Sequence, residues 1–143
     1  NKVAPVSALF QRQQHQNCTA TTTLKFTPKS EKELAGITCY QSERFNYVFG
    51  ITKKDKDFYL LLQRTEKGQS KIIASTIIDV KKPVQLQVTA RGEDYRFNYS
   101  TDGVKFTNLG GTVSGDILST NVAGGFTGSL IGLYATSANE AQP

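Results

Sequence analysis

An alternation of apolar and polar residues runs through most of the chain. Over 84–91, Val84, Leu86, Val88 and Ala90 are separated by single polar residues. A period of two places successive side chains on opposite faces of a β-strand. The same pattern recurs over 22–26, 45–51, 58–62 and 95–99. Further strands are predicted over 34–41, 70–78, 104–109 and 129–136, and no stretch has the pattern of a helix of three turns.

Glycine-containing turns separate these predicted strands at short intervals. The segments 66–69 and 91–94 each contain one glycine. The pair Asp102-Gly103 is a strong hairpin signal because it tolerates the positive φ of a tight turn. Many short strands joined in this way predict an all-β sandwich or barrel. Because 129–136 is apolar on both faces, we expect a two-sheet antiparallel β-sandwich.

The length of 143 residues predicts one domain, large enough to bury about two-thirds of its extended-chain surface. We assign residues 1–143 to this domain, with 1–12 as a linker leading into the sandwich and 137–143 as a loose tail. No apolar stretch is long enough to span a membrane, so no membrane partner is expected. The chain begins at Asn1 without a methionine or a signal-peptide pattern, and we interpret it as a piece of a longer protein.

The basic charge is spread along the chain. Seventeen Lys and Arg residues against twelve Asp and Glu residues give a net charge of +5. A nucleic-acid-binding protein gathers its basic side chains on one surface with aromatic residues between them. No such stripe is visible in the sequence, and we expect no nucleic-acid partner.

Residues for catalysis or metal binding are scarce. The only histidine, His15, has no nucleophile motif near it, and the carboxylates stand in or beside turns, whereas a glycosidase needs two facing acids. No catalytic residue is therefore assigned. Cys18 and Cys39 form no CxxC pair and are expected to be buried free thiols. No cofactor is expected, although Asp79 and Asp116 leave a structural calcium ion open.

What remains is a set of aromatic and amide side chains of the kinds that bind sugars. Rings stack on the apolar faces of pyranoses, and amides bond to hydroxyl groups. The alternative is that most of these rings belong to the core, which strict alternation favours for Tyr95, Phe97 and Tyr99. The set comprises Tyr40, Phe45, Tyr47, Tyr59, Tyr95 and Tyr99 with Gln41, Gln63, Gln87, Asn46, Asn98 and Arg96.

One segment, Val122-Ala-Gly-Gly-Phe-Thr-Gly128, places an aromatic residue between glycines shortly before the last apolar run. Gly124, Gly125 and Gly128 leave nothing bulky beside Phe126. Two interpretations are open. The ring is directed at something outside its own domain, or it folds back into its own core as most apolar residues do.

Six segments stand in a characteristic order: Gln11-Arg-Gln-Gln-His15, Thr19-Ala-Thr-Thr-Thr-Leu-Lys-Phe26, Ala35-Gly-Ile-Thr-Cys-Tyr-Gln41, Tyr95-Arg-Phe-Asn-Tyr-Ser-Thr-Asp-Gly103, Leu118-Ser-Thr-Asn-Val-Ala-Gly-Gly-Phe-Thr-Gly128 and Ile131-Gly-Leu-Tyr-Ala135. Together they resemble the C-terminal domain of glycoside hydrolase family 43 β-xylosidases. The resemblance extends over roughly residues 8–136. It implies a concanavalin A-like jelly roll packed against a five-bladed catalytic propeller in the same polypeptide.

The resemblance also implies a role for two groups of residues. In the family, a sandwich loop contributes an aromatic residue to the wall of the propeller's pocket. This role falls on Phe126, with Gly124, Gly125 and Thr127 forming the loop around it. The segment containing Arg12, Gln14 and His15 is expected at the domain interface. The family usually ends with a further strand that has a run like Ala-Asp-Phe-Asp-Tyr-Phe, and no such run precedes Pro143.

The sequence therefore supports an accessory, non-catalytic domain of a xylosidase or arabinofuranosidase that acts on xylo- or arabino-oligosaccharides. An autonomous module that binds xylan or arabinan on its concave sheet is the alternative, and a purely structural spacer is a third. We expect a bacterial protein of the periplasm or the cytoplasm.

Overall fold

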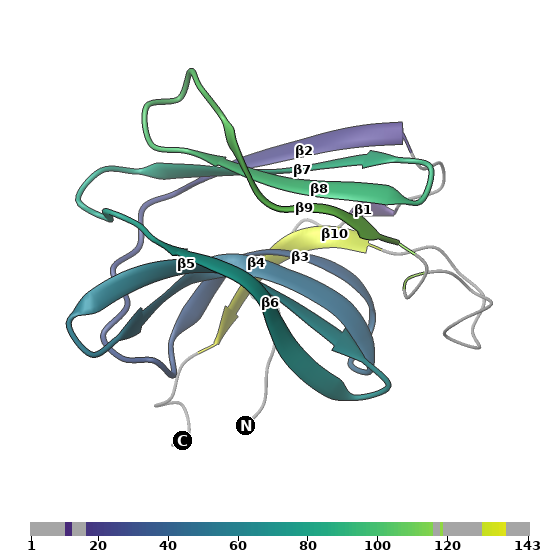
Figure 1. Cartoon of the computed structure of the whole chain (residues 1–143), viewed down its shortest axis with the longest axis horizontal. Coiled ribbons are helices and arrows are strands. Elements are labelled where there is room, and N and C mark those ends of the chain that lie inside the picture. The colour runs from purple at the N-terminus through teal and green to yellow at the C-terminus, as the bar shows by residue number, and fades with distance from the viewer. Residues whose placement is uncertain (1–10, 13–16, 116–117, 119–129, 137–143) are drawn as a thin grey trace.

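Two antiparallel sheets packed face to face make up the chain (Figure 1). The computed structural model describes residues 11–12, 17–115, 118 and 130–136. Nearly all of these residues lie in strands or in the turns between them. Within these ranges, no helix is long and apolar enough to cross a membrane. The predicted all-β sandwich is confirmed.

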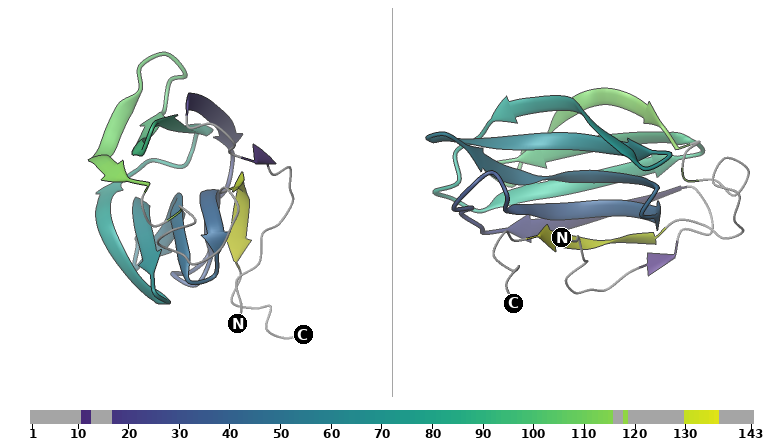
Figure 2. Two further views of the ribbon diagram at one scale, coloured as in Figure 1. Left: turned by 90° about the vertical axis from the view of Figure 1, so that its right-hand side faces the viewer. Right: turned by 90° about the horizontal axis from the view of Figure 1, so that it is seen from below.

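The larger sheet has six described strands and the smaller sheet has four (Figure 2). In spatial order the larger sheet contains β1 (Gln11–Arg12), β10 (Leu130–Thr136), β3 (Leu34–Ser42), β4 (Phe45–Lys54), β5 (Asp57–Glu66) and β6 (Gln69–Ile77). The smaller sheet contains β2 (Asn17–Leu24), β7 (Val84–Arg91), β8 (Asp94–Ser100) and β9 (Thr107–Ser114). Strand β1 begins inside the segment predicted as a linker, and residues 1–10 and 137–143 lie outside the described residues.

The core is one cluster that spans both sheets. The smaller sheet supplies the alternating apolar residues of β7, which are all buried as predicted. Tyr47 and Phe49 of the larger sheet tilt against Phe97 of the smaller one, with ring centroids 5.6 and 5.3 Å apart. Such tilted contacts add to the free energy gained by burying the rings. Tyr95 and Phe97 are buried and Tyr99 packs beside them, so the prediction that these rings belong to the core is confirmed.

Most turns lie where the sequence predicts them. The β5–β6 turn has positive φ at Lys67 and Gly68, and the β7–β8 turn has positive φ at Gly92. The connection between β8 and β9 is longer than a two-residue Asp-Gly turn. The last paired residues are Tyr99 and Thr107, and residues 101–106 form the loop. In this loop, the Asp102 carboxylate accepts hydrogen bonds from the backbone amides of Val104 and Lys105 at 2.8 and 2.9 Å.

One predicted strand is shifted. The strand expected over 104–109 runs from Thr107 to Ser114, and Val104 is 82% exposed. The side chain of Asp102 bonds the amides that would otherwise extend the strand, and this favours a loop. Val104 and Phe106 have the alternating apolar spacing of a strand, although both residues lie in a loop.

The larger sheet is curved. Toward both ends its strands bend away from the smaller sheet, which leaves the outer face concave (Figure 1). On this face Gly36 of β3 lies opposite Gly50 of β4. A Cβ on Gly36 would collide with the backbone carbonyl of Phe49, and one on Gly50 would lie 2.5 Å from the carbonyl oxygen of Ala35. These two glycines therefore permit a close approach of β3 and β4.

Candidate functional site

The two segments predicted to carry the site adjoin the same strand pair, β1 and β10, at one of its ends. Arg12, the last residue of β1, lies opposite Leu130, the first residue of β10. Residues 13–16 follow β1, and residues 119–129 precede β10. The pairing therefore brings the ends of both segments to one edge of the larger sheet, although they are more than a hundred residues apart in the sequence.

Several turns meet at the same end of the sandwich, which we call the loop end. Leu130, Tyr40, Asn46 and Thr65 form one cross-strand row of the larger sheet. Beyond this row lie the β3–β4 and β5–β6 turns, which are joined by a 3.1 Å hydrogen bond from the Gly68 amide to a backbone carbonyl. The smaller sheet contributes the β7–β8 turn and the segment Ser114–Gly115, joined by a 2.7 Å bond from the Gly115 amide to the Glu93 carbonyl.

The segment that contains Phe126 is anchored in the described structure on both sides. Leu118 precedes it and is buried in the core with 3% of its surface exposed. The Leu118 amide donates a 2.9 Å hydrogen bond to the Gly115 carbonyl. Leu130 follows the segment and pairs with Tyr40 of β3. The two anchors hold the ends of this segment at the loop end.

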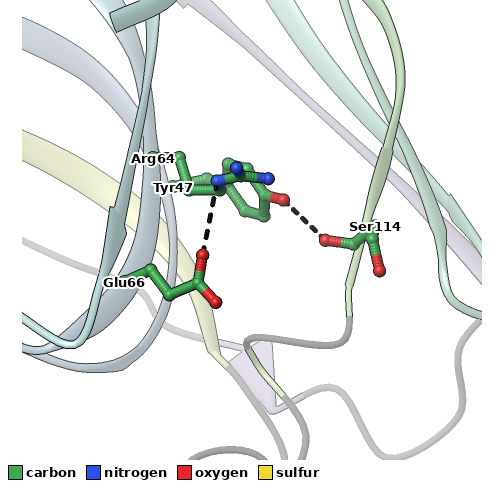
Figure 3. A network of polar contacts seen from close by, with 4 residues as sticks. All are labelled: Tyr47, Arg64, Glu66 and Ser114. Atoms are coloured by element: carbon green, nitrogen blue, oxygen red, sulfur yellow. Dashed lines mark hydrogen bonds and ion pairs between the residues drawn. The ribbon is translucent and has the colours of Figure 1, made fainter. Parts of the chain in front are cut away.

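A polar network connects the two sheets where β9 ends (Figure 3). The Tyr47 hydroxyl of β4 donates a 2.6 Å hydrogen bond to the backbone carbonyl of Ser114, where β9 ends. Arg64 of β5 lies beside Tyr47, and its Nε is 3.9 Å from the Glu66 carboxylate. The hydrogen bond fixes the point from which the chain leaves β9 toward Leu118.

The protonation of Tyr47 suits this role. Burial raises the pKa of the Tyr47 phenol, and the neighbouring Arg64 guanidinium opposes part of that shift. Because the net change is upward, the phenol stays neutral and keeps the proton that it donates to Ser114. Sequence reasoning placed Tyr47 in the set of sugar-binding side chains and missed this structural role, since no local pattern links Tyr47 to Ser114.

Most of the predicted sugar-binding side chains fall into three groups, and the first of these groups is buried. Phe45, Tyr47 and Tyr95 belong to the core. Their faces are occupied by other apolar side chains, so they present nothing to a ligand. For these three rings the interpretation as core residues holds.

The second group is engaged on the outer face of the smaller sheet. Asn98 donates a 2.9 Å hydrogen bond to Gln87, and Asn108 donates a 3.1 Å bond to Asn98. Arg96 donates a 2.8 Å bond to Thr112. These amide and guanidinium groups satisfy one another across neighbouring strands, which favours a structural role for them.

The third group lies on the concave face of the larger sheet, at the end opposite the loop end. Tyr59 and Gln63 of β5 line a groove with a volume of about 430 Å³. Neither side chain makes a hydrogen bond with another residue in the part of the chain that the structure describes. Leu61, between them in the strand, contributes an apolar floor that is 7% exposed. The groove is lined by Glu31, Leu34, Thr52, Lys53, Lys54, Tyr59, Leu61, Gln63, Ile72 and Ser75.

Hydrogen bonds from the backbone amides of Val104 and Lys105 lower the pKa of the Asp102 carboxyl. A general acid of a glycosidase needs a raised pKa. The described ranges also contain no group of three or more His, Cys, Asp or Glu side chains placed to hold a metal ion. Asp79 accepts a 2.9 Å bond from the Lys81 amide, and Asp116 lies outside the described residues.

The two cysteines face the core from different sheets. Cys39 of β3 is buried and Cys18 of β2 is half-buried, and neither forms a disulfide bond. Burial raises the pKa of both thiols. A buried thiol with a raised pKa is a poor nucleophile, so neither cysteine is a candidate for covalent chemistry.

The site residues predicted from the sequence fall largely outside the described ranges. This applies to Gln14 and His15 and to Gly124, Gly125, Phe126 and Thr127. Arg12 is described through its backbone pairing in β1. The structure therefore defines the anchors of the predicted site, and the roles of these side chains stay predictions.

Comparison with known proteins gives the family. The model of the β-xylosidase C-terminal concanavalin A-like domain, a domain of glycoside hydrolase family 43, matches residues 1–143. The chain belongs to this family. Its fold matches a family 43 crystal structure from a capybara gut metagenome with a TM-score of 0.80 and 39% identity, covering 90% of this chain and 25% of the other.

Two curated relatives are similar over nearly the whole chain. The non-reducing end α-L-arabinofuranosidase BoGH43B of Bacteroides ovatus is 31% identical over 94% of this chain. The xylosidase/arabinosidase 43B of Humicola insolens is 27% identical over 90% of it. The matched region is 25% and 26% of these two proteins, so the chain spans about a quarter of the length of its relatives. The recognition of the family from sequence motifs is thus confirmed.

Proposed function

We propose that this chain is a non-catalytic accessory domain of a family 43 xylosidase or arabinofuranosidase. In this proposal it packs against the catalytic propeller of the same polypeptide, and Phe126 forms part of the wall of the substrate pocket. The relatives named as an arabinofuranosidase and a xylosidase/arabinosidase support the substrate class of xylo- and arabino-oligosaccharides. Their fourfold greater length leaves room for a catalytic domain outside the matched region.

The observation that carries the proposal is the pairing of β1 with β10. It gathers the ends of the Arg12–His15 segment and of the Phe126 loop at one edge of the loop end. A partner domain joined through the N-terminal side of the chain would meet both segments there. An aromatic side chain placed in the pocket would exclude water from the substrate and supply apolar contact to it.

Phe126→Ala in the full-length enzyme tests the proposal. We expect kcat/KM for a nitrophenyl xyloside or arabinofuranoside to fall about tenfold, which corresponds to about 1.4 kcal/mol of transition-state stabilisation. The melting temperature should change little. The matched control is Phe106→Ala, which alters a partly exposed ring on the loop after β8, away from the loop end. This control should leave kcat/KM unchanged.

Two outcomes would contradict the proposal. A large loss of thermal stability with normal kinetics in Phe126→Ala would make Phe126 a core residue. Turnover of either nitrophenyl glycoside by the pure 143-residue chain would show that the chain is catalytic by itself.

A further inference from the structure

The groove on the concave face of the larger sheet presents polar groups that the fold itself does not use. Tyr59, Gln63 and Ser75 line it without a side-chain hydrogen bond to any residue in the described ranges. In contrast, Thr52 at its edge is engaged, since its hydroxyl donates a 2.8 Å bond to the Glu33 carbonyl. The unused hydroxyl and amide groups are therefore available to a ligand.

The strand register explains why these groups converge. Gln63 pairs with Ile72, Leu61 with Ser75, and Tyr59 with Ile77, so alternate residues of β5 and β6 share the outer face. A register shift between Leu62 and Gln63 accompanies this pairing. Gly50 lies opposite Leu61 in the same cross-strand row and has no side chain to fill the hollow. The result is a shallow trough with Tyr59 toward one end and Gln63 toward the other.

The chemistry of the groove selects among ligand classes. Leu61 and Ile72 give an apolar floor, and Tyr59 adds one ring with a hydroxyl group. The charged groups of the lining are of both signs: Glu31 is negative, Lys54 is positive, and Lys53 is positive with its ammonium 5.7 Å from the centre of the Phe58 ring. The groove therefore lacks the uniformly basic surface that would select a polyanion. A ring, an amide and hydroxyl groups that are free to donate and to accept match the alternating apolar faces and hydroxyl edges of a sugar.

We propose that this groove binds a neutral oligosaccharide, with Tyr59 stacking on a sugar ring and Gln63 bonding to its hydroxyl groups. The volume of about 430 Å³ falls in the range of roughly 300–1,000 Å³ typical of ligand pockets. The site is distinct from the loop end and does not depend on the proposed accessory role. It would hold a chain of sugars on the domain while the catalytic domain acts elsewhere on the same polymer.

Nuclear magnetic resonance titration of the 143-residue chain with xylotriose and cellotriose, at millimolar concentration, tests this site. We expect saturable shifts confined to the amides of the residues that line the groove, on β4, β5 and β6 and over 31–34. Tyr59→Ala and Gln63→Ala should each weaken binding about tenfold, equal to about 1.4 kcal/mol. Tyr40→Ala is the matched control, because Tyr40 pairs with Asn46 in the cross-strand row at the loop end of the larger sheet. The affinity of this variant for the trisaccharides should stay unchanged.

The negative outcomes are equally definite. The absence of saturable shifts with both trisaccharides would overturn the proposal, as would binding that both groove variants leave intact. Binding by the 143-residue chain that disappears in the full-length enzyme would also overturn it, because the groove would then be a domain interface. The first two results do not bear on the accessory role, which the Phe126→Ala kinetics test separately, whereas the third would move the domain interface from the loop end to the groove.

Discussion

At the scale of single residues, a few positions decide what the surrounding sheet can do. Gly36 and Gly50 lie opposite each other where β3 and β4 approach too closely for a Cβ. Tyr47 is completely buried, yet its hydroxyl reaches a backbone carbonyl at the sheet edge. Each of these residues is explained by a contact with a different strand, so its role follows from packing rather than from its sequence neighbours.

Gly36→Ala should destabilise the protein by at least about 2 kcal/mol, because the added methyl group would collide with the Phe49 carbonyl. Urea unfolding followed by circular dichroism measures this change. Gly92→Ala is the control: it has open space around the added carbon, and only its positive φ is unfavourable, which costs about 1 kcal/mol. Equal losses for the two variants would mean that the close approach of β3 and β4 is not a constraint.

At the scale of elements, hairpins and edge pairings place the candidate sites. The β1–β10 pair brings the ends of two distant segments to one edge, and the β5–β6 pair contributes half of the residues that line the groove. The Tyr47 hydrogen bond to Ser114 ties β4 to the end of β9, just before the segment that leads to Phe126. Strand pairing therefore determines which residues meet, and the turns determine how far the loops between strands extend.

Tyr47→Phe should lower the free energy of unfolding by about 1–2 kcal/mol, since the Ser114 carbonyl loses this donor inside the protein. Amide exchange at Gly115, adjacent to Ser114, should become faster in the same variant. Tyr99→Phe removes a hydroxyl that has no described hydrogen-bond partner, and it should change stability by less than about 0.5 kcal/mol. An unchanged free energy of unfolding in Tyr47→Phe would show that this hydrogen bond does not hold the two sheets together at the loop end.

At the scale of the whole molecule, one continuous core joins the two sheets. In this cluster, residues of β3, β4 and β5 pack against residues of β7 and β8. A single shared core favours cooperative, all-or-none unfolding. The concave face and the loop end lie outside this core, at separate places on the surface.

We expect the unfolding curves from far-ultraviolet circular dichroism and from tyrosine fluorescence to coincide. The chain has six tyrosines and no tryptophan, and Tyr47 and Tyr95 report on the core. Two separated transitions would show that the sheets unfold independently. The midpoints should shift together in a variant that leaves a cavity between the sheets, such as Leu86→Ala.

The fold was predictable from the sequence to a large extent. Alternation identified strands such as 84–91 and 95–99, because a half-buried strand needs exactly that pattern. The shifted strand after Phe106 was not predictable, because the Asp102 carboxylate accepts hydrogen bonds from the backbone amides of Val104 and Lys105, which overrides the apolar pattern there. For the groove, the sequence predicted only that Tyr59 and Gln63 are of the kinds that bind sugars. It did not separate them from rings of the same set that the core buries.

The sequence alone determined the strand periodicity, the turn positions and the family, because local spacing and ordered motifs encode these properties directly. Only the tertiary structure decided which aromatic rings lie in the core and which line a groove. It also decided that the end of the Arg12 segment meets the end of the Phe126 segment, since antiparallel pairing joins strands more than a hundred residues apart. The physical reason is that side-chain environment depends on the neighbouring strand, and the choice of neighbour is a property of the whole chain.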